Sequence, residues 1–373
     1  MKSALFIGSL AVFLILASCS STPSEGQEPI KIGAILILTG DLSNVGQAMQ
    51  QGIELAIDEI NMQGGFKGKP LQVVIEDDRL FVAGPIGAVT AAEKLVSQDH
   101  IVAGLVTAVN DAKPASPTFE INHVPLVTLW DSNEELENLG DYTFGIGFST
   151  ERAGEVMAEH AYNKLGLRRV ASAYHIDEWS QLIQENFVRR FKELGGEVKE
   201  FGAYSPEEKD YRTLIAQVNQ VKANGFYFPF IMNGDLIFKQ LKELGFKGTI
   251  LTGDVITPEI TQNVGTAAEG IYYTQVFAEQ SDRLDQVSRL FAEKYGEPSS
   301  MPVFNALGYD GIYTIFEAMK LAGSSDPEAI KTALYQVKGL QGATGTITIN
   351  EKGSAPKEER IWQIKEGKEV LLG

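Results

Sequence analysis

The sequence predicts an α/β protein with two lobes, each built on a parallel sheet that helices cover. Three observations lead to this fold class. Short apolar runs rich in β-branched residues alternate with segments of helical periodicity, the alternation starts again near residue 169, and the 373-residue chain is long enough for two domains. Because ligands bind beyond the carboxyl ends of parallel strands, we expect the site in the cleft between the lobes.

The first alternation begins at residues 30–38 (IKIGAILIL), an apolar run typical of a buried strand. Residues 45–63 carry apolar side chains at helical spacing, and two glycines end this helix. Further strands are expected at 71–75, 101–106 and 125–129, and helices at 85–96 and 112–121.

The second alternation repeats this pattern to the end of the chain. Strands are expected at 169–174, 198–203, 225–230, 250–251, 271–273, 345–349 and 360–364. Helices are expected at 180–194, 211–221, 236–244, 284–295, 304–321 and 327–337. Apolar strands separated by helices indicate parallel sheets.

The N-terminus predicts export and lipid attachment. Lys2 precedes an apolar run at residues 4–17, which is too short for a comfortable membrane span and is typical of a signal peptide. The predicted signal peptide covers residues 1–18. The sequence LASC ending at Cys19 resembles the cleavage box of bacterial lipoproteins, which implies a diacylglycerol on the Cys19 thiol. An ordinary signal with a chance cysteine is the alternative. Residues 19–29 are then a lipidated tether at a bacterial membrane, periplasmic or cell-surface.

Composition excludes several classes of function. The net charge of −17, without clustered basic residues, argues against nucleic-acid binding. Cys19 is the only cysteine, so no disulfide forms within the chain.

The sequence contains no phosphate-binding loop, nucleophile elbow or zinc-protease motif. His175, Asp177 and Glu178 are interpreted as a polar loop, because a third spaced metal ligand is missing. The carboxylates at residues 76–78 are interpreted as loop and capping groups. We therefore expect no enzyme activity, no cofactor and no metal.

A set of short motifs in order along the chain carries a family resemblance. These are Ile30-Lys31-Ile32-Gly33, Leu38-Thr39-Gly40, Gly46, Asn61-x-x-Gly64-Gly65-x-x-Gly68, Asp77-Asp78, Ala112, Val124-Pro125 and Tyr309-Asp310. They resemble the leucine/isoleucine/valine-binding proteins, the type I periplasmic binding proteins of ABC transporters. The resemblance implies two Rossmann-like lobes joined by three crossovers, a monomer, and an ABC permease as partner. It implies lobe I at 30–147 and 276–352, and lobe II at 148–275 and 353–373.

The resemblance places three ligand-binding positions in lobe I. Thr107 would offer a hydroxyl and helix N-terminal amides to a carboxylate, or act only as the helix N-cap. Trp130 and Ser132 fall on the next carboxylate-contacting pair, although tryptophan replaces a usually small residue and lobe packing is the alternative for Trp130.

Three further positions fall in lobe II. Trp179 is expected to face the cleft, with an exposed loop side chain as the alternative. Phe230 is a second aromatic candidate, with core packing as the alternative. Asp254 would pair with a ligand ammonium, or start a turn.

Together these positions predict a receptor that closes on a small amino acid of the branched-chain type and serves an ABC importer. Receptors for an aromatic or aliphatic carboxylate, an amide or urea are the alternatives within the family. A sensor ectodomain and an enzyme are the alternatives from other classes, disfavoured because no signalling segment or catalytic motif is found.

Overall fold

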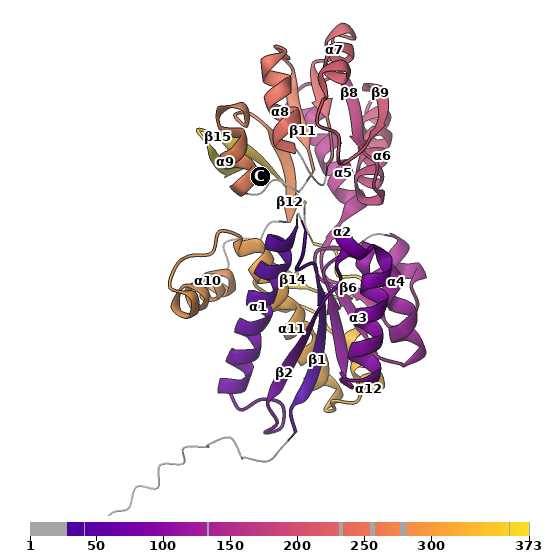
Figure 1. Ribbon diagram of the computed structural model, residues 1–373, viewed down its shortest axis with the longest axis vertical. Helices are drawn as coiled ribbons and strands as arrows, with labels where there is room; N and C mark the ends of the chain where they lie inside the picture. The colour runs from indigo at the N-terminus through magenta and orange to yellow at the C-terminus, as the bar shows by residue number, and fades with distance from the viewer. Residues whose placement is uncertain are drawn as a thin grey trace, which may run out of the picture.

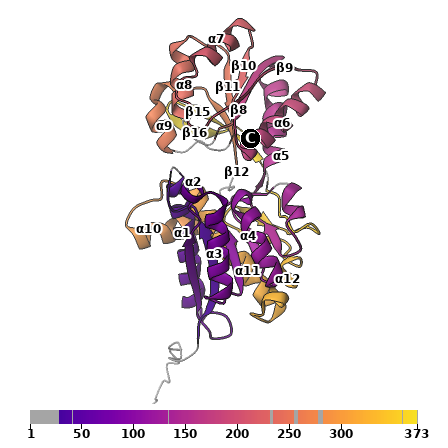
Figure 2. The ribbon, with the colours of Figure 1, turned by 45° about the vertical axis from the view of Figure 1, so that its right-hand side comes forward.

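Two α/β lobes are stacked along the long axis of the molecule (Figures 1 and 2). The computed structural model describes residues 28–40, 42–132, 134–230, 234–253, 258–276, 282–357 and 359–372. One lobe holds a five-stranded sheet and the other a seven-stranded sheet, here called lobe I and lobe II. The predicted fold class is confirmed. Among the described residues, no helix combines the length and apolarity needed to cross a bilayer.

The lobe I sheet has the strand order β2-β1-β3-β4-β6, with every pairing parallel. Its strands are β1 (Ile30–Leu36), β2 (Leu71–Asp77), β3 (Ala103–Val106), β4 (Leu126–Thr128) and β6 (Thr143–Gly145). Its helices are α1 (Ser43–Met62), α2 (Leu80–Ala83), α3 (Pro85–Ser97), α4 (Val109–Ile121), the 3₁₀ turn η1 (Glu134–Asn138), α10 (Asp282–Tyr295), α11 (Pro302–Ala322) and α12 (Pro327–Leu334).

Side-chain alternation in β1 assigns the helices of lobe I to two faces. Ile32, Ala34 and Leu36 belong to the core with α1 and α11, whereas Ile35 belongs to the core with α3 and α4. Figure 1 shows these helix pairs on opposite sides of the sheet. A small hairpin, β13 (Leu340–Gly342) and β14 (Gly345–Ile347), lies beside α11.

The lobe II sheet has the order β16-β15-β12-β11-β10-β8-β9. The strands β8 (Arg169–His175), β9 (Glu197–Tyr204), β10 (Gly225–Tyr227), β11 (Thr249–Thr252) and β12 (Tyr272–Val276) are parallel. β15 (Glu359–Lys365) and β16 (Lys368–Leu371) add an antiparallel edge that the alternation did not predict. The helices are α5 (Thr150–Glu159), the π-helical turn η2 (His160–Lys164), α6 (Glu178–Glu193), α7 (Arg212–Gln220), α8 (Gly234–Glu243), α9 (Pro258–Val264) and the 3₁₀ turn η3 (Gly265–Ala267).

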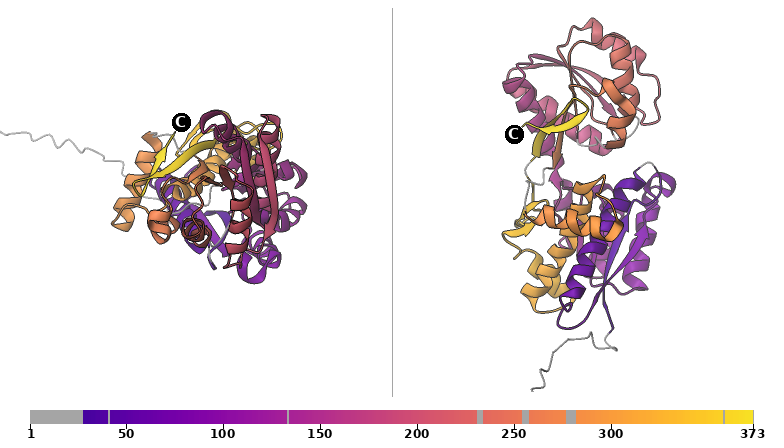
Figure 3. Two further views of the ribbon diagram at one scale, coloured as in Figure 1. Left: turned by 90° about the horizontal axis from the view of Figure 1, so that it is seen from above. Right: turned by 90° about the vertical axis from the view of Figure 1, so that its left-hand side faces the viewer.

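The chain crosses between the lobes three times, from β6 to α5, from β12 to α10 and from β14 to β15. The first crossover contains β7 (Phe148–Ser149), which pairs with β5 (Asp131–Ser132), and Phe148 forms a bridge to Lys357 of the third crossover. Lys357 is itself buried and ion-paired with Asp310 of α11 at 3.6 Å. Figure 3 shows the yellow C-terminal segment linking the two lobes. The exact residue boundaries of the lobes stay a prediction.

Candidate functional site

The carboxyl ends of both parallel sheets lie where the two lobes meet. β6 runs directly into the first crossover and β12 into the second, so both strands end at the side of their sheet that faces the other lobe. The other parallel strands of each sheet end at the same edge. Side chains that follow these strands are therefore the candidates for binding a solute between the lobes.

Thr107 follows β3 at this edge, but its hydroxyl already has partners. Its Oγ1 accepts a hydrogen bond from Ile37 N at 3.2 Å and donates to Ile35 O at 3.5 Å, and the side chain is fully buried. Thr107 is also not the cap of the helix that follows, because Ala108 occupies the N-cap position without a side-chain bond. Thr107 thus ties the ends of β1 and β3 together, and its contact with a ligand stays a prediction.

Asp131, which the sequence analysis did not single out, caps that helix from the next strand end. Its Oδ1 accepts a hydrogen bond from Val109 N, the first residue of α4, at 2.8 Å. Burial raises the pKa of the Asp131 carboxyl to about 6. The first backbone N–H of the helix that was predicted to receive a ligand carboxylate is therefore already bonded to a carboxylate of the protein.

A second buried acid lies at this edge. Asp111, in the first turn of α4, is fully buried, and neither oxygen of its carboxyl group has a hydrogen-bond partner in the described part of the chain. Burial, and then the charges of Asp78 and Asp131, raise the pKa of Asp111 well above its ordinary value. Asp77, by contrast, accepts hydrogen bonds from Leu38 N and Arg79 N, as the loop interpretation of residues 76–78 predicts.

Trp130 and Ser132 follow β4. The half-buried Trp130 ring packs edge-on against Phe304 of α11, with the ring centroids 5.1 Å apart, so it contributes to packing inside lobe I. Ser132 lies in β5, and its side chain falls outside the described part of the structure. The ligand roles of both residues stay predictions.

In lobe II, Trp179 lies in the first turn of α6 and reaches the end of β11. A methyl group added at Gly253 would lie 2.8 Å from Cη2 of Trp179, so the indole ring rests on this glycine. The half-buried ring is thus next to the segment that contains the predicted ammonium partner. Asp254 itself lies outside the described residues, and its role stays a prediction.

Phe230 packs inside lobe II. Its ring is 1% exposed and lies edge-on to His175 and Phe238, with centroid distances of 6.2 and 5.6 Å. His175 belongs to the same core and shares a hydrogen bond of 2.9 Å between its Nε2 and the Tyr211 hydroxyl. Burial lowers the pKa of His175 to about 4, so the ring is neutral. A ligand contact by Phe230 is untested, whereas its core packing is observed.

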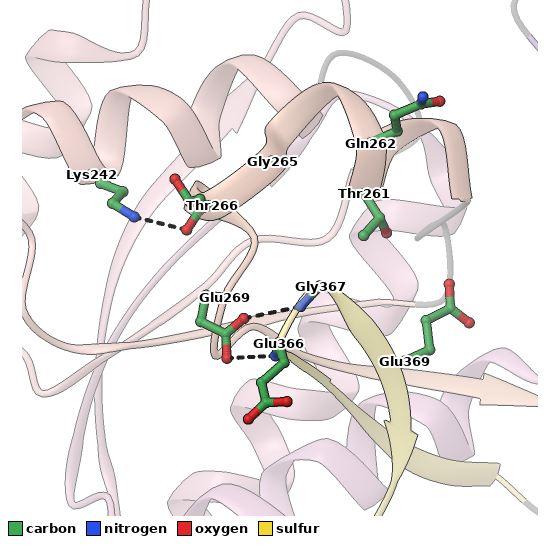
Figure 4. A pocket seen from close by; sticks show the side chains of 9 residues that line it. All are labelled: Lys242, Thr261, Gln262, Gly265, Thr266, Glu269, Glu366, Gly367 and Glu369. Carbon is green, nitrogen blue, oxygen red and sulfur yellow. Dashed lines mark hydrogen bonds between the residues drawn. The ribbon is translucent and has the colours of Figure 1, made fainter.

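A cavity of about 810 Å³ lies elsewhere in lobe II, between the helical segments after β10 and β11 and the β15–β16 turn (Figure 4). None of the six predicted binding residues lines it. Glu269 points to the turn and accepts hydrogen bonds from Glu366 N at 3.0 Å and Gly367 N at 3.3 Å (Figure 4). Its carboxylate therefore stabilises the hairpin. No group of three His, Cys, Asp or Glu side chains within the described ranges could hold a metal ion.

Comparison with known proteins covers both lobes. Residues 29–369 match the Periplasmic binding protein family. The Leu/Ile/Val-binding protein homolog 3 of Brucella melitensis is 27% identical over 358 residues, which cover 94% of this chain and 95% of that protein. The crystal structure of the leucine binding protein LivK from Thermotoga maritima has a TM-score of 0.83 at 27% identity, covering 92% of this chain and 98% of that one. LivJ from Streptococcus pneumoniae, solved with isoleucine, has the same fold with a TM-score of 0.83 at 23% identity over 92% of this chain and 99% of that one.

Proposed function

Because this chain belongs to the periplasmic binding protein family, we propose that it captures a small amino acid of the branched-chain type and delivers it to an ABC permease. The observation that carries this proposal is the match over residues 29–369, which spans both lobes and the edges between them. Relatives and structures of similar length are named for leucine, isoleucine and valine. The solute would bind between the lobes and favour their closure, since it contacts both lobes only in the closed state.

The placement of Trp179 supports a ligand site on lobe II. The ring lies at the carboxyl end of the sheet, beside Gly253 and one residue from Asp254. We propose that Asp254 pairs with the solute ammonium while the indole ring covers it, because a desolvated ammonium requires a charged partner and gains from an aromatic face. Ser132 and the backbone after β4 would supply the lobe I contacts.

One observation favours a second candidate, an amide or urea receptor. The Asp131 carboxylate accepts a hydrogen bond at the N-terminus of α4, where the family resemblance places a solute carboxylate. Negative charge there opposes a carboxylate and suits a solute that presents N–H donors.

A thermal-shift screen of the purified protein separates these candidates. Binding to the folded state raises the melting temperature by mass action. We expect leucine, isoleucine or valine to raise it, whereas acetamide, urea and benzoate leave it unchanged. A shift with acetamide or urea alone would support the second candidate, and a shift with benzoate alone would reject both.

We further propose that the receptor is exported, is anchored through a lipid on Cys19, works as a monomer and releases its solute unchanged. The motif before Cys19 and the polar stretch at residues 20–29 support the anchor. Recovery of chemically altered solute after incubation would contradict a pure binding role.

A further inference from the structure

The side chain of Lys113 joins the two lobes. Lys113 lies in α4 of lobe I and forms ion pairs with Glu135 of η1 in the same lobe and with Glu178 of lobe II. The Nζ to Oε1 distance to Glu178 is 2.5 Å. Since Glu178 is the first residue of α6, which packs on β8 and β9, this ion pair links the helix layer of one lobe to that of the other.

The bridging lysine is partly withdrawn from water. Its side chain is 26% exposed, against 47% for Glu178. Although burial works against the charged form, the carboxylates of Glu135 and Glu178 raise the pKa of Lys113, so its ammonium stays charged. Partial burial reduces the screening that weakens fully exposed ion pairs.

The lobe II end of the bridge is fixed to the candidate site. Asp177 caps α6 by accepting a hydrogen bond from Ser180 N at 2.8 Å, which orders the turn that carries Glu178. Trp179 is the next residue, and its ring rests on Gly253. The ion pair between Lys113 and Glu178 therefore constrains the first turn of α6, which also carries Trp179.

We propose that Lys113 is a positioning residue for solute capture, which bridges Glu135 and Glu178, draws the lobes together and holds Trp179 over the cleft. The inference rests on the proposed function for the identity of the site, but the bridge itself is made by side chains of the protein. It makes lobe approach dependent on ionic strength, because added salt screens the attraction.

Substitutions at Glu178 and Lys113 test the bridge and leave Glu135 in place. Glu178→Gln leaves Lys113 paired with Glu135, so the variant loses the ion pair between the lobes, and the net charge of the three-residue cluster changes from −1 to 0. Lys113→Met removes the whole bridge, and Lys113→Arg keeps the charge. Matched controls are Glu185→Gln on the same helix, which loses only a contact with Gln181, and Lys192→Met, which loses a pair with Glu200 inside lobe II.

The measurement is the distance between spin labels on the two lobes, by double electron–electron resonance on the full chain with Cys19→Ser. Labels at the exposed positions Ile121→Cys and Leu244→Cys report lobe separation. In 50 mM NaCl we expect Glu178→Gln and Lys113→Met to lower the population of the closer arrangement about two- to fivefold, which corresponds to one ion pair. Raising the NaCl concentration to 1 M should lower this population in the parent protein as well. Lys113→Arg in 50 mM NaCl should keep the population of the parent, because arginine retains the positive charge.

In the Glu178→Gln background, adding Lys113→Met should cause no further loss of the closer arrangement, because the ion pair between the lobes is already absent. Unchanged distances in both single variants, equal shifts in the control variants, or additive shifts in the double variant would overturn the proposal. Titration with L-leucine separates this result from the proposed function. If leucine fails to bind while the distances shift as expected, the amino-acid assignment is wrong and the bridge stands.

Discussion

Asp111 shows how a single buried acid can couple folding to pH. Its carboxyl group is fully buried, and burial, followed by the charges of Asp78 and Asp131, raises its pKa. An unfolded aspartate ionises near pH 4. The folded chain therefore keeps a proton that the unfolded chain has lost, and stability falls as pH rises from about 4 through the folded pKa.

Asp111→Asn removes this ionisation and leaves a polar side chain of similar size. We expect the free energy of unfolding at pH 8 to rise by about 1–3 kcal/mol, because the amide has no ionisation that the folded state opposes, and its pH dependence to flatten. Urea denaturation at pH 5 and pH 8 measures both. The same change at the exposed Asp285 is the control. If both variants give the parent's pH profile, Asp111 does not hold the proton.

Trp179 is the residue for which placement and predicted role agree most closely. Trp179→Ala should weaken solute binding about tenfold, because an aromatic face over a desolvated cation contributes roughly 1–2 kcal/mol, while Trp179→Phe should keep most of the affinity. Affinity by calorimetry and folding by circular dichroism check this together. Equal affinity in all three proteins would reject the ligand role.

At the scale of elements, α1 and α11 depend on glycine for their close approach. A Cβ at Gly52 would lie 1.8 Å from the carbonyl oxygen of Asn305, and one at Gly308 would lie 2.1 Å from that of Met49. The side-chain amide of Asn305 donates to Ala48 O at 2.7 Å and fixes the two helices further.

Gly52→Ala should therefore destabilise lobe I by about 1–3 kcal/mol, the typical result of overpacking. Gln47→Ala, on the exposed face of the same helix, should be close to neutral. Chemical denaturation measures the free energy of unfolding of both variants. If Gly52→Ala is as stable as the parent, α1 and α11 can move apart without a loss of stability, and the expectation is wrong.

Most strands and helices could be predicted from the sequence, and those that were missed lack a clear local pattern. β1 was predicted because it is a run of mostly apolar residues, and β8 because its apolar residues stand between helical segments. β6 was missed because its sequence, TFG, offers one large apolar residue and no apolar run, and α5 was missed although Ser149 caps it through the backbone N–H of Arg152. β15 was predicted as a strand, but its antiparallel direction depends on pairing with β12, which periodicity does not encode.

The candidate site was only partly predictable for a related reason. Strand ends could be located, so Thr107 and Trp179 were assigned to the correct edges. Whether a side chain faces the cleft or the core depends on its tertiary partners. Phe230 packs with His175, and Asp131 caps a helix that comes earlier in the chain. The capping contact spans 22 residues, so local sequence does not reveal it.

At the scale of the whole molecule, the expected anchor and the expected receptor are separate parts. Cys19→Ser should move the protein from the membrane fraction to the soluble fraction and leave solute affinity unchanged, because none of the candidate binding positions falls in residues 19–29. Fractionation followed by calorimetry tests both statements. A variant that remains in the membrane fraction would show that lipid on Cys19 is not the anchor.

The two lobes, their three crossovers and the match over residues 29–369 lead to one central claim, that the protein is an amino-acid receptor. Calorimetric titration of the purified protein with leucine, isoleucine and valine tests it most directly. The account predicts binding of one solute per chain to at least one of them, with a dissociation constant of about 1 μM or lower and a free energy near −8 kcal/mol. Absence of binding heat for all three at several temperatures, in a protein that still unfolds cooperatively, would contradict the account.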